Sequence, residues 1–93
     1  MTEDGESHEG LGLAERRIWW RSRRGLRELD LLLLPFVEDV YPSLDTAARA
    51  VYLRLLDHED PELLVWLTGR EVPADPQLAA MVERVRAHDR PVS

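Results

Sequence analysis

Apolar residues recur every three or four positions through most of the chain. From residue 26 to residue 40 they follow the spacing of a single helix face, falling at Leu26, Leu29, Leu33, Phe36, Val37 and Val40. The same spacing returns near the C-terminus at Leu78, Met81, Val82 and Val85. No stretch alternates apolar and polar residues for long enough to indicate a strand. The pattern therefore predicts an all-α protein.

Glycine, proline and aspartate residues divide this pattern into five predicted helices. The first runs from about residue 13 to residue 23 and ends near Gly25, which can adopt a left-handed conformation at low cost. The second begins near residue 26 and closes at residues 41–43; Pro35 interrupts it and is expected to kink it. The third follows Asp45, its expected N-cap, and ends near residue 57. Short connections between these helices predict a small compact five-helix bundle.

The fourth and fifth predicted helices both open on an Asp-Pro pair. Asp60 and Asp75 are the expected N-caps, because a carboxylate at that position accepts backbone N–H groups. The proline that follows loses only an N–H that would have no partner. In the fourth helix Leu63, Trp66 and Leu67 are expected to face the core, and Gly69 is expected to end the helix.

One domain accounts for the length of the chain. Ninety-three residues leave room for a single small core, which we assign to residues 12–88. Residues 1–11 are predicted to form a disordered acidic tail, and residues 89–93 a C-terminal tail. The N-terminus resembles neither a signal peptide nor a transit peptide, and no apolar run approaches the ~20 residues of a membrane span. These features favour a soluble, cytoplasmic protein with no membrane insertion.

Charge is unevenly distributed in this acidic chain, whose formal net charge is -6. Residues 14–27 carry six arginines and a single glutamate, with Trp19 and Trp20 among them. A solvated helix face and a binding surface both explain this segment, whereas the acidic balance of the whole chain disfavours nucleic acid. Adjacent helical residues project about 100° apart, so one tryptophan can enter the core. The other either packs at the edge of the bundle or contacts a partner.

Residues suited to catalysis or metal binding are scarce. The chain has no cysteine, and its histidines (His8, His58 and His88) share no ligand spacing. Ser22, Ser43 and Ser93 lack a companion base. A domain of this size also rarely encloses a deep cleft. We therefore expect no enzyme activity, no metal site and no stably bound cofactor. A binding or helper module is the favoured class.

The segment RRGLRELD, residues 23–30, lies between the first two predicted helices. A helix that ends at Gly25 explains part of it, with Glu28 reaching back to the N–H groups of the turn and pairing with Arg24 four residues away. Arg23, Arg27 and Asp30 then remain unexplained. Charges gathered around a bare turn beside a tryptophan indicate a polar recognition corner.

This corner resembles the succinate dehydrogenase assembly factor family, which comprises bacterial FAD assembly factors and their mitochondrial counterparts. The family motif R-G-x-x-E matches Arg24 to Glu28, and its fuller bacterial form RRGxRELD matches Arg23 to Asp30. Further blocks follow in the family's order between Arg17 and Ala87. They include LxPF at residues 33–36, DPxLxxWL at residues 60–67 and PAD at residues 73–75.

The resemblance implies a small five-helix bundle and a non-catalytic helper. Such proteins promote covalent attachment of FAD to the flavoprotein subunit of succinate dehydrogenase and, in bacteria, of fumarate reductase. FAD is thus the partner's cofactor. We expect the protein to be a monomer. The partner-binding residues that the resemblance and its surroundings imply are Trp20, Arg23, Arg24, Gly25, Leu26, Glu28 and Asp30. The alternative is a regulatory interaction module, similar to an antitoxin and unrelated to flavin.

Overall fold

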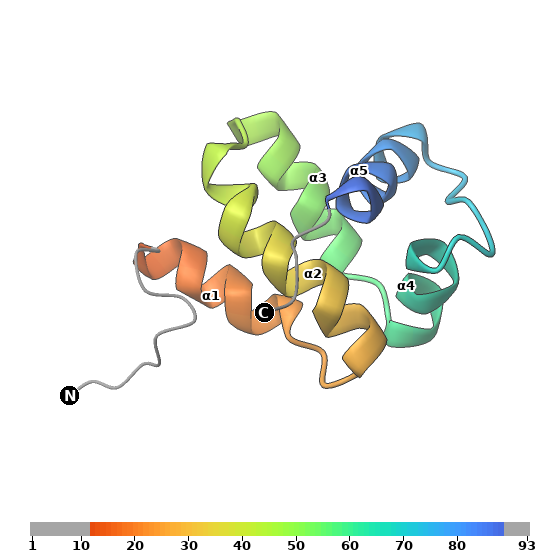
Figure 1. Cartoon of the computed structure of the whole chain (residues 1–93). Coiled ribbons are helices and arrows are strands. Elements are labelled where there is room, and N and C mark those ends of the chain that lie inside the picture. Colours follow the sequence, from red (N-terminus) through yellow and green to blue (C-terminus); the bar gives the residue numbers. More distant parts are fainter. Residues whose placement is uncertain (1–11, 89–93) are drawn as a thin grey trace.

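The computed structural model describes residues 12–88, and within this range it contains helices and no strand. The elements are α1 (Leu13–Ser22), α2 (Arg27–Asp39), the short 3-10 helix η2 (Tyr41–Ser43), α3 (Thr46–Leu56), α4 (Asp60–Leu67) and α5 (Pro76–Ala87). The predicted all-α five-helix bundle is confirmed (Figure 1). The tails expected at residues 1–11 and 89–93 lie outside the described residues.

Two of the three expected aspartate caps form. The carboxylate of Asp45 accepts the N–H of Ala48 at 2.8 Å, and that of Asp75 accepts the N–H groups of Gln77 and Leu78. The prediction that Asp60 caps the fourth helix is wrong. Glu59 occupies the N-cap position of α4 without a side-chain cap, and Asp60 is the first helical residue. The carboxylate of Asp60 instead binds Arg24, which lies between α1 and α2.

Helix α2 lies at the centre of the bundle and contacts α1, α4 and α5 (Figure 1). It continues unbroken through Pro35, which removes the backbone hydrogen bond to the carbonyl of Leu31. The core consists of buried side chains from every α-helix and from the segment around η2: Trp19, Leu29, Leu33, Phe36, Val37, Tyr41, Leu44, Tyr52, Leu55, Leu56, Leu63, Leu67, Leu78, Met81, Val82 and Val85. Trp66 is partly buried and packs against this core.

One residue of the predicted apolar face of α2 does not reach the core. Leu26 is 38% exposed, because it precedes the helix as its N-cap in an extended conformation. The remaining positions of that face point inward as predicted, although Val40 does so only partly. Among residues 12–88, no helix has the length and apolar character that crossing a membrane requires.

Candidate partner-binding site

The α1–α2 turn displays a bare stretch of backbone. Helix α1 ends at Ser22, and Gly25 has φ +84°, the left-handed conformation that its position predicts. Beyond its chain neighbours, a Cβ atom added at Gly25 would meet no other atom of the described residues within 4 Å. Only the backbone conformation therefore requires glycine here, and the space above the turn is open to another molecule.

Asp30, and not Glu28, closes this turn. Its Oδ1 atom accepts the backbone N–H of Arg24 at 2.8 Å. The prediction that Glu28 reaches back to the turn is wrong. Glu28 and Asp30 are two residues apart on α2, so their side chains project about 200° apart and only one of them can face the turn. Asp30 therefore faces the turn and is partly buried, whereas Glu28 faces solvent.

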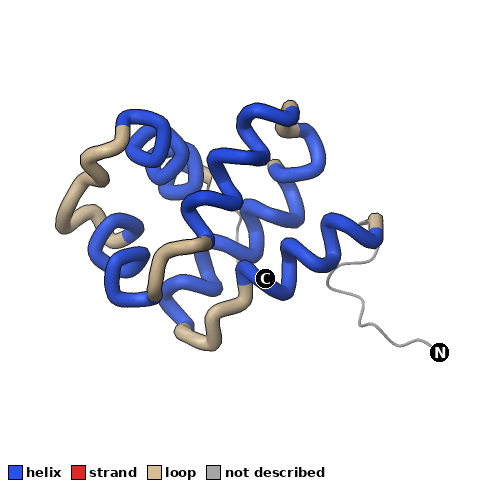
Figure 2. Tube along the Cα trace, turned by 180° about the vertical axis from the view of Figure 1, so that it is seen from behind, coloured by secondary structure: helices blue, strands red, loops and turns tan. Residues whose placement is uncertain are grey.

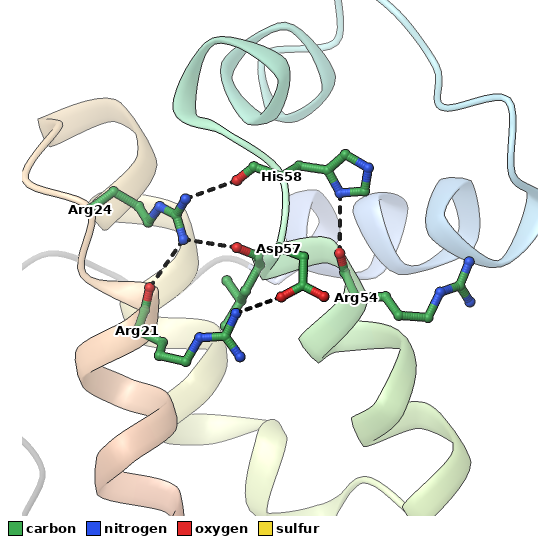
Figure 3. A network of polar contacts seen from close by, with 6 residues as sticks. Arg21, Arg24, Arg54, Asp57 and His58 are labelled. Atoms are coloured by element: carbon green, nitrogen blue, oxygen red, sulfur yellow. Dashed lines mark hydrogen bonds and ion pairs between the residues drawn. The ribbon is translucent and has the colours of Figure 1, made fainter.

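Arg24 points into the protein. Its Nε atom donates to Asp60 Oδ1 at 2.8 Å, and its Nη2 atom donates to the carbonyl oxygen of His58 at 2.9 Å. Its Nη1 atom donates to the carbonyl oxygens of Leu56 and Arg21 at 3.1 and 3.3 Å (Figure 3). The expected pairing of Arg24 with Glu28 is therefore wrong. The guanidinium instead joins the α1–α2 turn to the α3–α4 loop, and Figure 2 shows these two connections side by side from behind.

The α3–α4 loop has further contacts of its own. Asp57 pairs with Arg21 of α1 at 2.8 Å on the exposed side of the loop (Figure 3). His58 Nδ1 lies 3.1 Å from the carbonyl oxygen of Arg54, and because a carbonyl only accepts, this nitrogen carries the proton. The imidazole also packs edge-on against Trp66, with ring centroids 4.9 Å apart. The loop is thus held on three sides by α1, α3 and α4.

The two adjacent tryptophans divide between core and surface. Trp19 is buried, and its indole N–H donates to Glu38 Oε2 at 2.6 Å. Trp20 is 57% exposed and packs edge-on against Trp19, with ring centroids 4.9 Å apart. The sequence left open which of the pair is exposed. Trp20 is therefore the aromatic side chain that α1 presents to solvent.

The seven predicted site residues separate into two groups. Trp20, Arg23, Gly25, Leu26 and Glu28 are exposed, whereas Arg24 and Asp30 are partly buried beneath them. Arg23 and Glu28 form no ion pair with any other residue of the range 12–88, and the same holds for the neighbouring Arg27. We call the five exposed residues and Arg27 the docking surface. It offers cations, an anion, an indole and bare backbone for contact with another molecule.

The hydroxyl groups near this surface lie in the core. Ser22 is fully buried and donates to the carbonyl oxygen of Ile18 at 2.8 Å. The Tyr52 hydroxyl lies 2.7 Å from Ser22 Oγ and must be the donor of that pair, because the single proton of Ser22 is already used. Burial raises the pKa of Tyr52, so the phenol stays neutral. This pair links α1 to α3 within the core.

Within residues 12–88, no group of three or more histidine, cysteine or acidic side chains is placed to hold a metal ion. The two described histidines are engaged elsewhere. His58 contacts the end of α3, and His88 Nε2 lies 2.9 Å from Asp39 Oδ2. The chemistry that the described site offers is hydrogen bonding, ion pairing and aromatic contact with a partner.

Comparisons with known proteins agree on one family. A family model described as flavinator of succinate dehydrogenase matches residues 16–89. The chain is 48% identical over 75 residues to the FAD assembly factor SdhE of Shewanella oneidensis, covering 81% of this chain and 92% of that protein. It is 41% identical over 85 residues to the protein of the same name from Colwellia psychrerythraea, covering 91% and 93%. A third such factor, from Pseudomonas aeruginosa, is 44% identical over 70 residues, covering 75% and 83%.

Proposed function

Since this chain belongs to the family of flavinators of succinate dehydrogenase, we propose that it binds the flavoprotein subunit of that enzyme through the docking surface. As an FAD assembly factor, it promotes the covalent attachment of FAD to that subunit. The observation that carries the site assignment is the exposed turn at Gly25 within the R-G-x-x-E segment, where an added Cβ atom would have, beyond its chain neighbours, no other atom of residues 12–88 within 4 Å. The flavin is the partner's cofactor, and this chain holds none of its own.

The factor acts by binding and leaves bond formation to the flavoprotein and the flavin. A protein that binds one conformation of its partner more tightly shifts the partner's population toward that conformation. The described residues suit such a role, because the side chains of the docking surface can form charge-assisted hydrogen bonds and an aromatic contact. Each charge-assisted bond is worth about 1.5–3 kcal/mol.

All seven residues contribute to the site in this proposal. Trp20, Arg23, Gly25, Leu26 and Glu28 meet the flavoprotein at the surface, and Arg24 and Asp30 support them from beneath. The chain works as a monomer in the cytoplasm, and it also serves the related flavoprotein subunit of fumarate reductase. Its partners do not include nucleic acid, and it does not insert into a membrane.

A reconstitution with purified components tests this proposal. The flavoprotein subunit, prepared without flavin, is mixed with FAD in the presence or absence of this protein. Covalent flavin is then measured as fluorescence that stays with the denatured subunit. We expect this protein to accelerate attachment and to emerge chemically unchanged. Equal rates with and without it would refute the assignment, and flavin bound covalently to this protein would refute the non-catalytic role.

A further inference from the structure

We propose that Asp60, at the start of α4 and outside the R-G-x-x-E motif, is a positioning residue of the docking surface that acts through Arg24. This inference rests on the proposed function. In this proposal the α3–α4 loop fixes the shape of the α1–α2 turn. Arg24 of the motif binds this loop, and it supports partner binding by holding the turn in place.

The guanidinium of Arg24 is already engaged by groups of this chain. The Arg24 side chain is only 18% exposed, and all three of its nitrogens donate to groups of this chain. Three of its acceptors are uncharged carbonyl groups, those of Arg21, Leu56 and His58. Asp60 is the one anion that pairs with it among residues 12–88. A guanidinium held in this way has little hydrogen-bonding capacity left for a partner.

Asp60 binds Arg24 and does not cap α4. An aspartate at the start of a helix ordinarily caps that helix, yet α4 has no side-chain cap and the carboxylate of Asp60 faces Arg24. The position still suits a negative charge, because the N-terminus of α4 carries a partial positive charge. The carboxylate therefore stays in place between the helix end and the guanidinium.

The contacts that hold Arg24 also hold the α1–α2 turn. Arg24 immediately precedes Gly25, and its backbone N–H is held by Asp30 at 2.8 Å while its side chain is held by Asp60 at 2.8 Å. Without the charge on Asp60, a partly buried guanidinium would lack its counter-ion and would move toward water. The turn would then sample several conformations, and binding would include the cost of ordering it.

The same loop provides a matched control. Asp57 also pairs with an arginine, Arg21, at 2.8 Å, but this pair is more exposed, with 69% of the Asp57 side chain accessible against 33% for Asp60. Arg21 lies within α1 and its side chain does not support the turn. Asp57→Asn therefore removes a charge three residues away and leaves in place the bonds from Arg24 to Asp30 and Asp60.

The experiment measures the initial rate of covalent FAD attachment to the purified flavoprotein subunit as the concentration of this protein is varied. We expect Asp60→Asn to raise the half-saturating concentration about tenfold and to leave the maximal rate unchanged. Asp57→Asn should stay within about twofold of the unsubstituted protein, as expected for an exposed pair. Equal effects of the two substitutions would overturn the proposal.

Two further readouts separate positioning from mere stability. Amide hydrogen exchange, measured by NMR without the partner, should become faster at Arg24 in Asp60→Asn while the amides of Val37 and Leu55 keep their protection. The double variant Arg24→Ala with Asp60→Asn should dock no worse than Arg24→Ala alone. Additive effects, or faster exchange throughout the core, would contradict positioning.

Asp60→Ser serves as a second variant, and loss of helical circular dichroism in both variants would also count against positioning. If the unsubstituted protein fails to promote attachment, the proposed function fails, whereas the exchange at Arg24 still tests the link between Asp60 and the turn.

Discussion

Two turns of this protein place a glycine in the same left-handed conformation but in different surroundings. Gly25, between α1 and α2, has φ +84°, and Gly69, after α4, has φ +81°. A Cβ atom at Gly69 would lie 2.7 Å from Nη2 of Arg86, whereas one at Gly25 would have, beyond its chain neighbours, no other atom of residues 12–88 within 4 Å. The backbone around Gly69 is tied to its own helix, since the N–H of Gly69 donates to Trp66 and that of Arg70 donates to Val65.

The comparison separates a glycine that ends a helix from one that exposes a surface. At Gly69 the chain folds back over α4, and the side chain of Arg86 from α5 covers the glycine. At Gly25 the turn is supported from beneath by Arg24 and Asp30, which are partly buried. The exposed residues around it include Arg23, Arg27 and Glu28, which form no ion pair within residues 12–88. The same backbone requirement thus serves folding at Gly69 and leaves room for a partner at Gly25.

The largest expected effect is that of Gly25→Arg. We expect covalent FAD attachment to fall to the rate seen without the factor, because a long side chain would occupy the space in which the partner docks. The fold should survive, since a left-handed non-glycine residue costs about 1–2 kcal/mol. Attachment is measured by flavin fluorescence of the denatured flavoprotein, and folding by far-ultraviolet circular dichroism. Loss of the helical spectrum would assign Gly25 the same folding role as Gly69.

Glu28→Ala should also weaken function without weakening the fold. Glu28 is exposed and makes no ion pair within residues 12–88, so its removal leaves the described fold intact. Loss of a charge-assisted bond to the flavoprotein should weaken binding about ten- to hundredfold. Isothermal titration calorimetry with the flavoprotein subunit measures this. Asp30→Ala is the control that should instead lower the melting temperature, because it releases the N–H of Arg24. A lower melting temperature for Glu28→Ala would show that Glu28 also supports the fold.

Gly69→Ala tests whether Gly69 serves the fold and not the docking of a partner. The backbone strain of about 1–2 kcal/mol should lower the melting temperature by about 4–16 °C, and Gly25→Ala should do the same. The clash of the new methyl group with Arg86 adds little to this loss of stability. The end of the Arg86 side chain can move aside, and its ion pair with Glu83 is exposed and contributes little. Thermal unfolding measures both variants. Flavin attachment by Gly69→Ala should remain normal below its melting temperature, and impaired attachment would bring the α4–α5 loop into the docking site.

The smallest expected effect is a pH dependence in the loop that follows Gly69. The backbone N–H of Gln77 holds the pKa of Asp75 below its usual 3.8, and the N–H of Leu78 and the ion pair with Arg54 act in the same direction. A lowered native pKa stabilises the fold above the unfolded value, and this contribution is lost as the pH falls through the native value. The melting temperature of the unsubstituted protein should therefore exceed that of Asp75→Asn at about pH 6 and approach it near about pH 3. A difference independent of pH would contradict this origin.

The sequence predicted the helices well because their signals are local. Periodic apolar positions, the aspartate cap at Asp75 and the glycines after α1 and α4 depend on residues within a few positions of each other. The start of α4 was misjudged by one residue, since Glu59 and Asp60 are both acidic and a long-range contact decides between them. Arg24, 36 positions away in the sequence, binds the carboxylate of Asp60.

The candidate site was found from its motif, but the orientation of its side chains was not. Periodicity could not tell Trp19 from Trp20, because either can face the core when the orientation of α1 is unknown. Asp30 binds the turn in place of Glu28, because the two side chains project about 200° apart on α2 and their spacing does not say which of them faces the turn. That Arg24 faces inward follows from the packing of the α3–α4 loop against the turn, which no spacing within residues 23–30 encodes.

The central claim is that the open turn at Gly25 acts on the flavoprotein of succinate dehydrogenase. Its most direct test is in-gel flavin fluorescence of that subunit from cells that lack the gene for this protein and carry it back in different forms. We predict that the unsubstituted protein and Gly69→Ala restore fluorescence and that Gly25→Arg does not. Full fluorescence in the cells without the gene, or in those with Gly25→Arg, would contradict the claim.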